Sequence, residues 1–262
     1  MTTALPIAIP TPANAGSVEV VAIPAVSHAE AMGLASTEFT RMIALLEQLT
    51  IDDWHQPTVC APWNVHQLVA HVVGMAEAQA SFRQFVHDFR SARKRSGGAM
   101  IDAMNATQVR ERADLTTGQL VERLIATAPR AVRSRKRAPA PMRKLKLMKQ
   151  DPPFETERWT YGFLVDTIFT RDPWVHRIDI SRATGREVVI TAAHDGRIVA
   201  AVVAEWSRRH GKPFSLTLTG DAGGRWQSGT SGEQIELDAL DFCWTLSGRA
   251  AGKGLLATPV PF

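Results

Sequence analysis

The chain has 262 residues, of which 45% are hydrophobic, and this is enough to fill the core of one large domain or two modest ones. The net charge is only +4, and the absence of any apolar run of about 18 residues or more excludes a membrane-spanning helix. Two widely separated cysteines, Cys60 and Cys243, exclude a disulfide framework and suit a reducing cytoplasm. We therefore expect a globular, cytoplasmic protein.

The first predicted elements are a tail and two helices. Residues 1–26 are rich in proline and alanine, lack the features of a secretory signal, and are predicted to form a flexible tail. A capping box at residues 27–30 begins a helix that ends near Gln48. Asn64 is a predicted N-cap of a second helix, which runs towards Phe89 with an apolar side.

Two more helices follow in the first two thirds of the chain. Apolar residues at helical spacing predict a third helix over residues 116–128 and a fourth over residues 155–183. Pro173 lies inside the fourth helix, where it removes a backbone hydrogen bond and strains the preceding turn. We therefore expect a kink at Asp172.

A basic segment separates the third helix from the fourth. Residues 130–149 are dense in arginine and lysine and contain no acidic residue. Because Pro139 and Pro141 interrupt them, we expect a solvated loop or a frayed helix end. An anionic partner is the alternative, although the segment has no nucleic-acid motif and no interleaved aromatic residues, so nucleic acid is not expected.

The pattern changes to a small α/β unit from residue 186 onward. Helices are predicted at residues 192–209 and 239–249, and short strands at residues 214–219, 225–227 and 234–237. The strands alternate apolar and polar residues and are separated by glycine-rich turns. This pattern favours an antiparallel sheet built from hairpins.

Asp172 and His176 are spaced to bind a metal ion together. On an α-helix, residues four apart lie on the same face, so both side chains can converge on one cation. His71, on the second helix, is the candidate third ligand. Two imidazoles and one carboxylate suit zinc, and also non-haem iron, nickel or manganese. The alternatives are a core histidine at position 71 and a surface Asp–His pair flanked by Arg171 and Arg177.

Four neighbours of these residues have candidate roles. Asp179 is predicted to accept a hydrogen bond that orients His176, or to pair with Arg182. Trp63 and Trp174 are candidates to form the wall of a cofactor pocket, although core packing is the alternative for each. Cys60 either approaches the metal or is a buried, inert thiol. The chain contains no phosphate-binding loop, dinucleotide fingerprint, nucleophile elbow or Cys-pair zinc motif, so the metal carries the predicted chemistry.

Residues 60–71, followed by residues 172–179, resemble the mycothiol-dependent maleylpyruvate isomerase family, within the DinB-like superfamily. Residues 241–249 are also similar to the last helix of that family. The resemblance covers residues 27–254. It implies a DinB-like, metal-binding four-helix bundle and a C-terminal α/β domain similar to sterol carrier proteins.

The domain boundaries that we predict follow from this resemblance. The bundle is expected over residues 27–185, with a basic insertion near residues 130–150. The α/β domain is expected over residues 186–262. A compact bundle lacks such an insertion, so the parent activity does not follow from the fold alone.

The resemblance also implies site residues and a reaction. The family's His, Glu and His ligands correspond to His71, Asp172 and His176, so aspartate replaces glutamate and shortens the reach by one methylene. Arg249 matches the catalytic arginine, which would bind a substrate carboxylate or stabilise a developing oxyanion. Zinc is the expected metal, and mycothiol or a similar low-molecular-weight thiol is the expected cofactor. The thiolate adds to a conjugated double bond and leaves after rotation, or stays on the product in an S-transfer.

Two other functions are consistent with the residues. The first is a non-catalytic protein that binds a metal or an apolar ligand and retains the fold. The second is metal-assisted hydrolysis, for which Asp179 is the candidate base. The preferred prediction is an enzyme that acts on a small electrophilic substrate, as a monomer or a homodimer.

Overall fold

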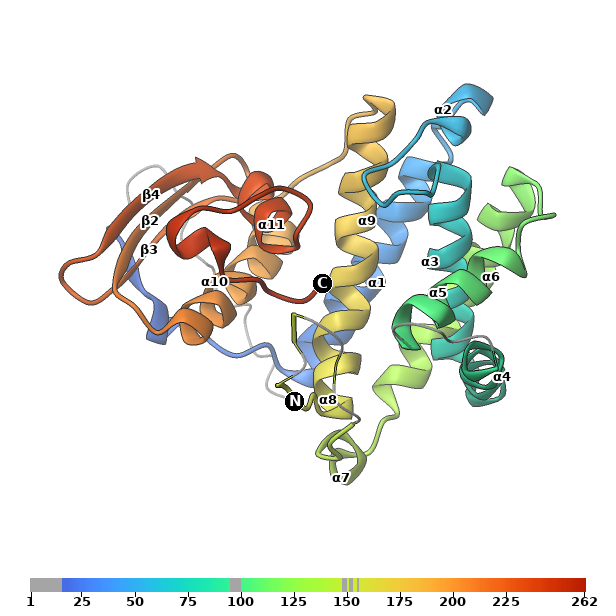
Figure 1. The fold of residues 1–262 in the computed structure, drawn as a ribbon, viewed down its shortest axis with the longest axis horizontal. Coiled ribbons are helices and arrows are strands. Elements are labelled where there is room, and N and C mark those ends of the chain that lie inside the picture. Colours follow the sequence, from blue (N-terminus) through green and yellow to red (C-terminus); the bar gives the residue numbers. More distant parts are fainter. Residues whose placement is uncertain (1–15, 95–99, 148–149, 151–152, 155) are drawn as a thin grey trace, which may run out of the picture. The chain divides into compact units, whose positions relative to one another are not determined.

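The computed structural model describes residues 16–94, 100–147, 150, 153–154 and 156–262 (Figure 1). The chain divides into two compact units. The helical unit comprises Val26–Val188 together with Phe262, and the sheet unit comprises Val189–Pro261 together with the N-terminal residues up to Ala25. A helical domain is thus combined with a small sheet.

Four long helices form the helical unit's core: α1 (His28–Leu46), α3 (Val65–Ala80), α6 (Thr117–Lys136) and α9 (Phe169–Thr184). Since α1 and α3 each contact both α6 and α9, the four helices close into a bundle. The side chains of Ser27, Asn64 and Thr116 cap the first three of these helices, each accepting from the backbone N–H three residues later. Buried apolar residues of all four helices meet in one core.

Shorter helices surround this bundle: α2 (Ile51–His55), α4 (Phe82–Arg93), α5 (Met100–Arg110), α7 (Ala140–Arg143) and α8 (Tyr161–Phe163). The sequence pattern did not predict α5, which packs against both α3 and α4. None of the helices that the structure describes is long and apolar enough to cross a membrane.

The predicted helix from Asn64 towards Phe89 is two helices in the structure. Ser81 has extended backbone angles (φ −144°, ψ 113°), which end α3, and its hydroxyl accepts from the Gln84 N–H to begin α4. Serine favours such a cap because its short hydroxyl reaches the free N–H groups of the first turn. The prediction missed this break because apolar residues continue on both sides of it.

The third helix is longer than the sequence predicted. It continues through Pro129 to Lys136, because its buried face extends past the proline to Ala131 and Arg135. The first part of the basic segment is therefore the end of a helix, one of the two alternatives considered, rather than a solvated loop. Met148 and Lys149 lie outside the described residues.

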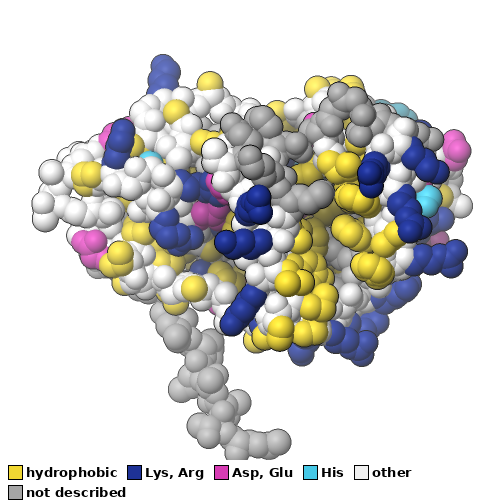
Figure 2. Space-filling view, turned by 60° about the horizontal axis from the view of Figure 1, so that its bottom comes forward, with side chains coloured by type: hydrophobic (Ala, Val, Ile, Leu, Met, Phe, Trp, Pro, Cys, Tyr) yellow, Lys and Arg dark blue, Asp and Glu magenta, His cyan; other side chains and the backbone are white. Residues whose placement is uncertain are grey.

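Exposed apolar and basic side chains lie next to each other on the helical unit. Met142 and Leu145, within the basic segment, are 47% and 58% exposed. Figure 2 shows one face of the molecule, on which Lys and Arg side chains lie beside hydrophobic ones. The anionic partner considered for this segment stays a prediction.

The fourth helix begins later than predicted and has no break at Pro173. Residue 155 lies outside the described part of the chain, and α8 begins at Tyr161. A π-helical turn, Leu164–Ile168, leads into α9, and Pro173 lies within α9. The structure thus places the irregular turn before α9 rather than at Asp172.

The side chain of Arg135 replaces the backbone hydrogen bond that Pro173 removes from α9. Pro173 has no N–H to donate to the Phe169 carbonyl four residues earlier, and Arg135 Nη1 donates to that carbonyl at 3.1 Å. In the π-turn, the Phe169 N–H donates to the Leu164 carbonyl. Arg135 Nε and Nη2 donate to the neighbouring Val165 carbonyl at 2.9 and 2.6 Å. One buried guanidinium therefore satisfies two carbonyls of the helix that carries Asp172.

The described part of the sheet unit contains four strands, β1 (Val18–Glu19), β2 (Phe214–Thr219), β3 (Gly224–Ser228) and β4 (Glu233–Asp238), in the order β1-β3-β2-β4. Only β2 and β3 pair antiparallel, because β1 pairs parallel to β3 and β4 pairs parallel to β2. The predicted antiparallel sheet was therefore wrong for the outer strands. A glycine-rich turn specifies a hairpin, but it does not specify which edge the next strand joins.

The end of the predicted N-terminal tail is part of this sheet. Val18 and Glu19 pair with Trp226 and Gln227 of β3, and a short 3₁₀ turn over Val20–Ala22 follows. A two-residue strand is too short to show alternation, so the sequence predicted a tail here. Residues 1–15 of the predicted tail lie outside the described residues.

Two helices accompany the sheet: α10 (Arg197–His210), preceded by a π-helical turn over Ala192–Gly196, and α11 (Ala239–Leu246). Trp206 of α10 is fully buried, and its indole donates to the Leu255 carbonyl at 3.0 Å. Its ring also packs against Phe214 and Phe242. The predicted helices at residues 192–209 and 239–249 are thus present, although α11 ends three residues early.

Candidate metal centre

The structure brings His71, Asp172 and His176 together. His71 Nε2 and His176 Nε2 lie 3.4 and 3.5 Å from Asp172 Oδ1. One ligand atom of each residue lies within 4.8 Å of the other two. Two atoms that bind zinc at about 2.0–2.1 Å with tetrahedral angles are about 3.4 Å apart. The contact of His71 Nε2 with Asp172 Oδ1 is a long hydrogen bond, and both distances match the spacing of ligands around one metal ion.

The second carboxylate oxygen of Asp172 has no described partner. This oxygen, Oδ2, is also buried. A buried carboxylate oxygen without a partner costs free energy, and a bound cation would remove that cost. The three residues therefore fit a divalent metal.

Both histidines present the nitrogen that a metal needs. His71 Nδ1 lies 3.0 Å from Gln108 Oε1, and His176 Nδ1 lies 2.8 Å from Asp179 Oδ2. Because each acceptor holds the proton on Nδ1, the lone pair of each neutral ring is on Nε2. Both Nε2 atoms face Asp172, which is the arrangement required for coordination.

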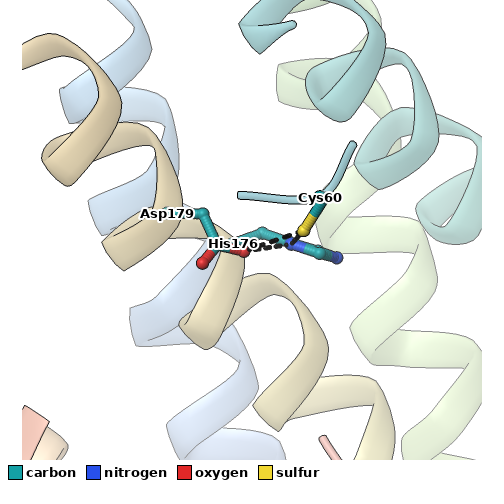
Figure 3. A group of neighbouring side chains, drawn as sticks. All are labelled: Cys60, His176 and Asp179. Atoms are coloured by element: carbon teal, nitrogen blue, oxygen red, sulfur yellow. Dashed lines mark hydrogen bonds and ion pairs between the residues drawn. The ribbon is translucent and has the colours of Figure 1, made fainter. Parts of the chain in front are cut away.

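Cys60 contacts the outer side of His176 rather than the group around Asp172. Its Sγ lies 3.4 Å from Asp179 Oδ2 and 4.0 Å from His176 Nδ1 (Figure 3). The thiol thus donates to the same carboxylate oxygen that accepts from the imidazole. This position assigns Cys60 to the support of Asp179, although the sequence also allowed a contact with the metal.

The two predicted pocket tryptophans lie in different surroundings. The Trp63 ring lies beside His71, with ring centroids 5.4 Å apart and planes at 31°. Trp174 is fully buried and stacks on Phe262 at 6.2 Å. Since residue 174 is two positions from both Asp172 and His176, it lies on the other side of α9. We assign Trp174 to core packing, the alternative considered for it.

Gln108, which the sequence did not indicate, is the partner of His71. It lies on α5, and its Nε2 faces the buried Asp88 carboxylate of α4 at 3.5 Å. A single glutamine in a weakly amphipathic helix belongs to no motif. The only sequence signal is that a polar side chain is needed near a buried histidine, and this does not identify the residue.

The part of the chain that carries this site matches a known protein family. The model of the mycothiol maleylpyruvate isomerase N-terminal domain matches residues 35–181, which is more than half of the chain and includes all three candidate ligands. The chain belongs to this family. The resemblance noted from its sequence motifs is therefore confirmed, and so is the prediction of an enzyme of an isomerase family.

Two solved structures share the fold of this family member. They are the crystal structure of the mycothiol-dependent maleylpyruvate isomerase and that of a histidine-to-alanine mutant. Each has a TM-score of 0.55 and 14% sequence identity, and each match covers 89% of this chain and 93% of the other. No curated protein matches the chain.

In the candidate metal site of this chain, the surroundings favour a charged Asp172–His176 pair when no metal is bound. Burial raises the pKa of Asp172, but the charges and hydrogen bonds of His71 and His176 outweigh this and hold it well below its ordinary value. Burial lowers the pKa of His176, yet the Asp172 charge outweighs it. Hydrogen bonds to Asp172, Asp179 and Cys60 add to that effect, so the pKa of His176 lies well above its ordinary value.

Metal affinity is expected to rise with pH. A metal binds only the neutral imidazole, so the proton that Asp172 stabilises on His176 must leave first. Zinc affinity should increase until the pH passes the raised pKa of His176 and then level off. Competition with a chelator at several pH values, corrected for the chelator's own protonation, measures this.

The free energy of unfolding of the metal-free protein should depend on pH through the same two pKa shifts, those of His176 and Asp172. The raised pKa of His176 contributes stability below the ordinary histidine pKa, and this is lost as the pH rises through the raised value. The lowered pKa of Asp172 contributes stability that is lost only in strong acid. A zinc affinity that does not change between about pH 6 and about pH 8, the range around the ordinary histidine pKa, would contradict the expected rise of metal affinity with pH.

Arg249, the predicted catalytic arginine, follows α11 in the sheet unit. It is half-buried, and its guanidinium carbon lies 6.0 Å from the centre of the Trp244 ring. An arginine placed over an indole retains its charge and its hydrogen-bond donors. Its catalytic role stays a prediction.

Proposed function

We propose that this protein is a zinc-dependent enzyme that uses mycothiol or a similar low-molecular-weight thiol. The reaction is an isomerisation, or an S-transfer, on a small electrophilic substrate that carries a carboxylate. The observation that carries the proposal is the spacing of His71, Asp172 and His176, in which the two imidazole Nε2 atoms lie 3.4 and 3.5 Å from Asp172 Oδ1. Family membership supports the same reaction class.

The ligand set suits catalysis rather than a structural metal. Three protein ligands leave a fourth tetrahedral position open, as in catalytic zinc sites. When bound, the metal supplies a Lewis acid that lowers the pKa of a thiol enough for the thiolate to form at neutral pH. The protein's part is to hold both imidazoles in the neutral tautomer that binds through Nε2.

The neighbours of the site favour this reaction over hydrolysis. Asp179, the candidate base, already accepts from His176 Nδ1 and from Cys60, so its Oδ2 orients a ligand. Trp63 lies beside His71 and offers an aromatic surface to a bound thiol or substrate. We further propose that Arg249 binds the substrate carboxylate, and that the sheet unit is similar to sterol carrier proteins.

The proposal predicts turnover that depends on both zinc and thiol. Maleylpyruvate is the first substrate to assay, with zinc-loaded protein in the presence and absence of mycothiol. Replacing Arg249 with glutamine should raise KM about 10-fold or more, because a charge-assisted hydrogen bond to a carboxylate contributes about 1.5–3 kcal/mol. Its zinc content should not change.

Arg208→Gln is the matched control, because Arg208 is an exposed arginine of the same unit. Its KM should equal that of the wild type. Thiol binding without turnover on any conjugated substrate would indicate the non-catalytic binding protein instead. Turnover that needs no thiol would indicate hydrolysis.

A further inference from the structure

We propose that Gln108 is a positioning residue of the metal centre, which links His71 to the buried carboxylate of Asp88 and thereby fixes the tautomer and the orientation of the His71 ring. This inference rests on the proposed metal site. The three residues lie on three helices, α3, α4 and α5. Two of these helices, α4 and α5, lie outside the four-helix bundle and would thus contribute to the site.

The three side chains form a buried chain of hydrogen bonds. Gln108 and Asp88 have no exposed surface, and His71 is 2% exposed. His71 Nδ1 lies 3.0 Å from Gln108 Oε1. Gln108 Nε2 donates to Asp88 Oδ2 at 3.5 Å and to Met75 Sδ at 3.4 Å. The other oxygen of Asp88 accepts from Gln84 Nε2 at 2.8 Å. Each end of the amide therefore has a polar partner away from solvent.

The Asp88 carboxylate determines which way the Gln108 amide points. A carboxylate accepts hydrogen bonds, so the NH₂ end of Gln108 faces Asp88 and the oxygen faces His71. The amide oxygen can only accept, so His71 must carry its proton on Nδ1. The lone pair on Nε2 is then directed towards Asp172.

Only an amide meets both demands at this position. A glutamate at position 108 would accept from His71, but it would set a second carboxylate against Asp88, and one of the two would have to take up a proton. A methionine would keep a similar length and lose both hydrogen bonds. Glutamine accepts at one end and donates at the other without any change of charge.

The backbone of α3 holds Gln108 in place. A Cβ atom added at Gly74 would lie 2.6 Å from Gln108 Cβ and 2.8 Å from its Cγ, so α5 approaches α3 as closely as glycine allows. Arg112, one turn further along, donates from Nη1 to the Gln108 carbonyl at 2.8 Å. The position of Gln108 is thus set by packing as well as by hydrogen bonds.

The two histidines of the centre are supported by different groups. His176 donates to the carboxylate of Asp179, whereas His71 donates to a neutral amide. A carboxylate acceptor makes an imidazole more basic than an amide does. We therefore expect His71 to be the ligand whose orientation depends most on packing around its partner.

Two variants test this by independent means, one chemical and one steric. Gln108→Met removes both hydrogen bonds, and Gly74→Ala displaces Gln108 through its Cβ. Each should weaken zinc binding about 10- to 100-fold, the usual effect of losing an outer partner of a metal-bound histidine. Gly33→Ala is the control for a helical glycine, because a Cβ there meets nothing within 4 Å, and it should bind zinc as the wild type does.

The decisive readout is the tautomer of His71 in the metal-free protein. Nitrogen NMR of the imidazoles, with His71→Gln used to assign the signals, should show the Nδ1–H form of His71 in the wild type and in Gly33→Ala. In Gln108→Met the two tautomers should mix. A merely structural role would lower the unfolding temperature without changing this signal.

An unchanged His71 signal together with unchanged zinc affinity in Gln108→Met would overturn the proposal. A wild-type protein that binds no zinc, but shows His71 in the Nδ1–H form only while Gln108 is present, would confirm that Gln108 fixes the tautomer and would refute the proposed function. The role assigned to Gln108 and the proposed function can therefore be refuted separately.

Discussion

Wild-type protein is expected to contain close to one equivalent of zinc, and His71→Ala and His176→Ala are expected to contain almost none. Each replacement leaves two protein ligands and an uncompensated Asp172 carboxylate, whose Oδ2 is buried and has no described partner. Loss of one of three ligands should weaken zinc binding about 1,000-fold or more, since the metal contributes on the order of 10 kcal/mol when its site is complete. Elemental analysis of untagged protein after dialysis measures the content.

His66→Ala is the matched control. His66 lies on the same helix as His71, but its Nε2 is hydrogen-bonded to the Leu115 carbonyl at 2.8 Å and its ring packs against Trp54. Its zinc content should equal that of the wild type. Folded wild-type protein that contains no metal and takes up no added Zn²⁺, Mn²⁺ or Ni²⁺ would mean that the three residues have a structural role only.

The second large effect is expected on stability, from Arg135→Met. Burial lowers the pKa of Arg135 to about 10, so the side chain stays charged at neutral pH. It donates to the carbonyls of Val165 and Phe169 and to the Thr170 hydroxyl. Methionine would leave these buried acceptors without a donor, which should lower the free energy of unfolding by about 3 kcal/mol.

Urea unfolding of the metal-free protein, followed by circular dichroism, measures this change. Arg133→Met is the matched control, because Arg133 is exposed on the same helix, and its effect should stay within about 0.5 kcal/mol. Arg135→Lys keeps the charge but not the planar set of donors, so its stability should lie between the two. Equal stabilities of Arg135→Met and Arg133→Met would contradict the role assigned to Arg135.

The proposed metal site and the buried Arg135 are connected through α9. Pro173 lies between the proposed ligands Asp172 and His176, and it leaves the Phe169 carbonyl without its helical donor. Arg135 supplies that donor from α6, so the bundle core holds the turn that presents Asp172. Arg135→Met should therefore also weaken zinc binding, although Arg135 is not a ligand.

Local patterns in the sequence account for much of the fold. The capping residues Ser27, Asn64 and Thr116 and the apolar stripes that follow them specify the starts of three bundle helices. Helical spacing likewise places Asp172 and His176 on one face, and the structure has them there. These features depend on residues a few positions apart, where backbone geometry fixes which side chains are neighbours.

The sequence by itself therefore determined most of the bundle helices, the Asp172–His176 pair on one face of α9 and the family to which the chain belongs. The tertiary structure decided what these patterns leave open: the division at Ser81, the parallel outer strands and the helix α5. It also decided the partners of the site, since Gln108 is 37 positions from His71 and Arg135 is 34 positions from Phe169. The physical reason is that buried polar groups must find partners, and any polar side chain that the fold brings close can serve.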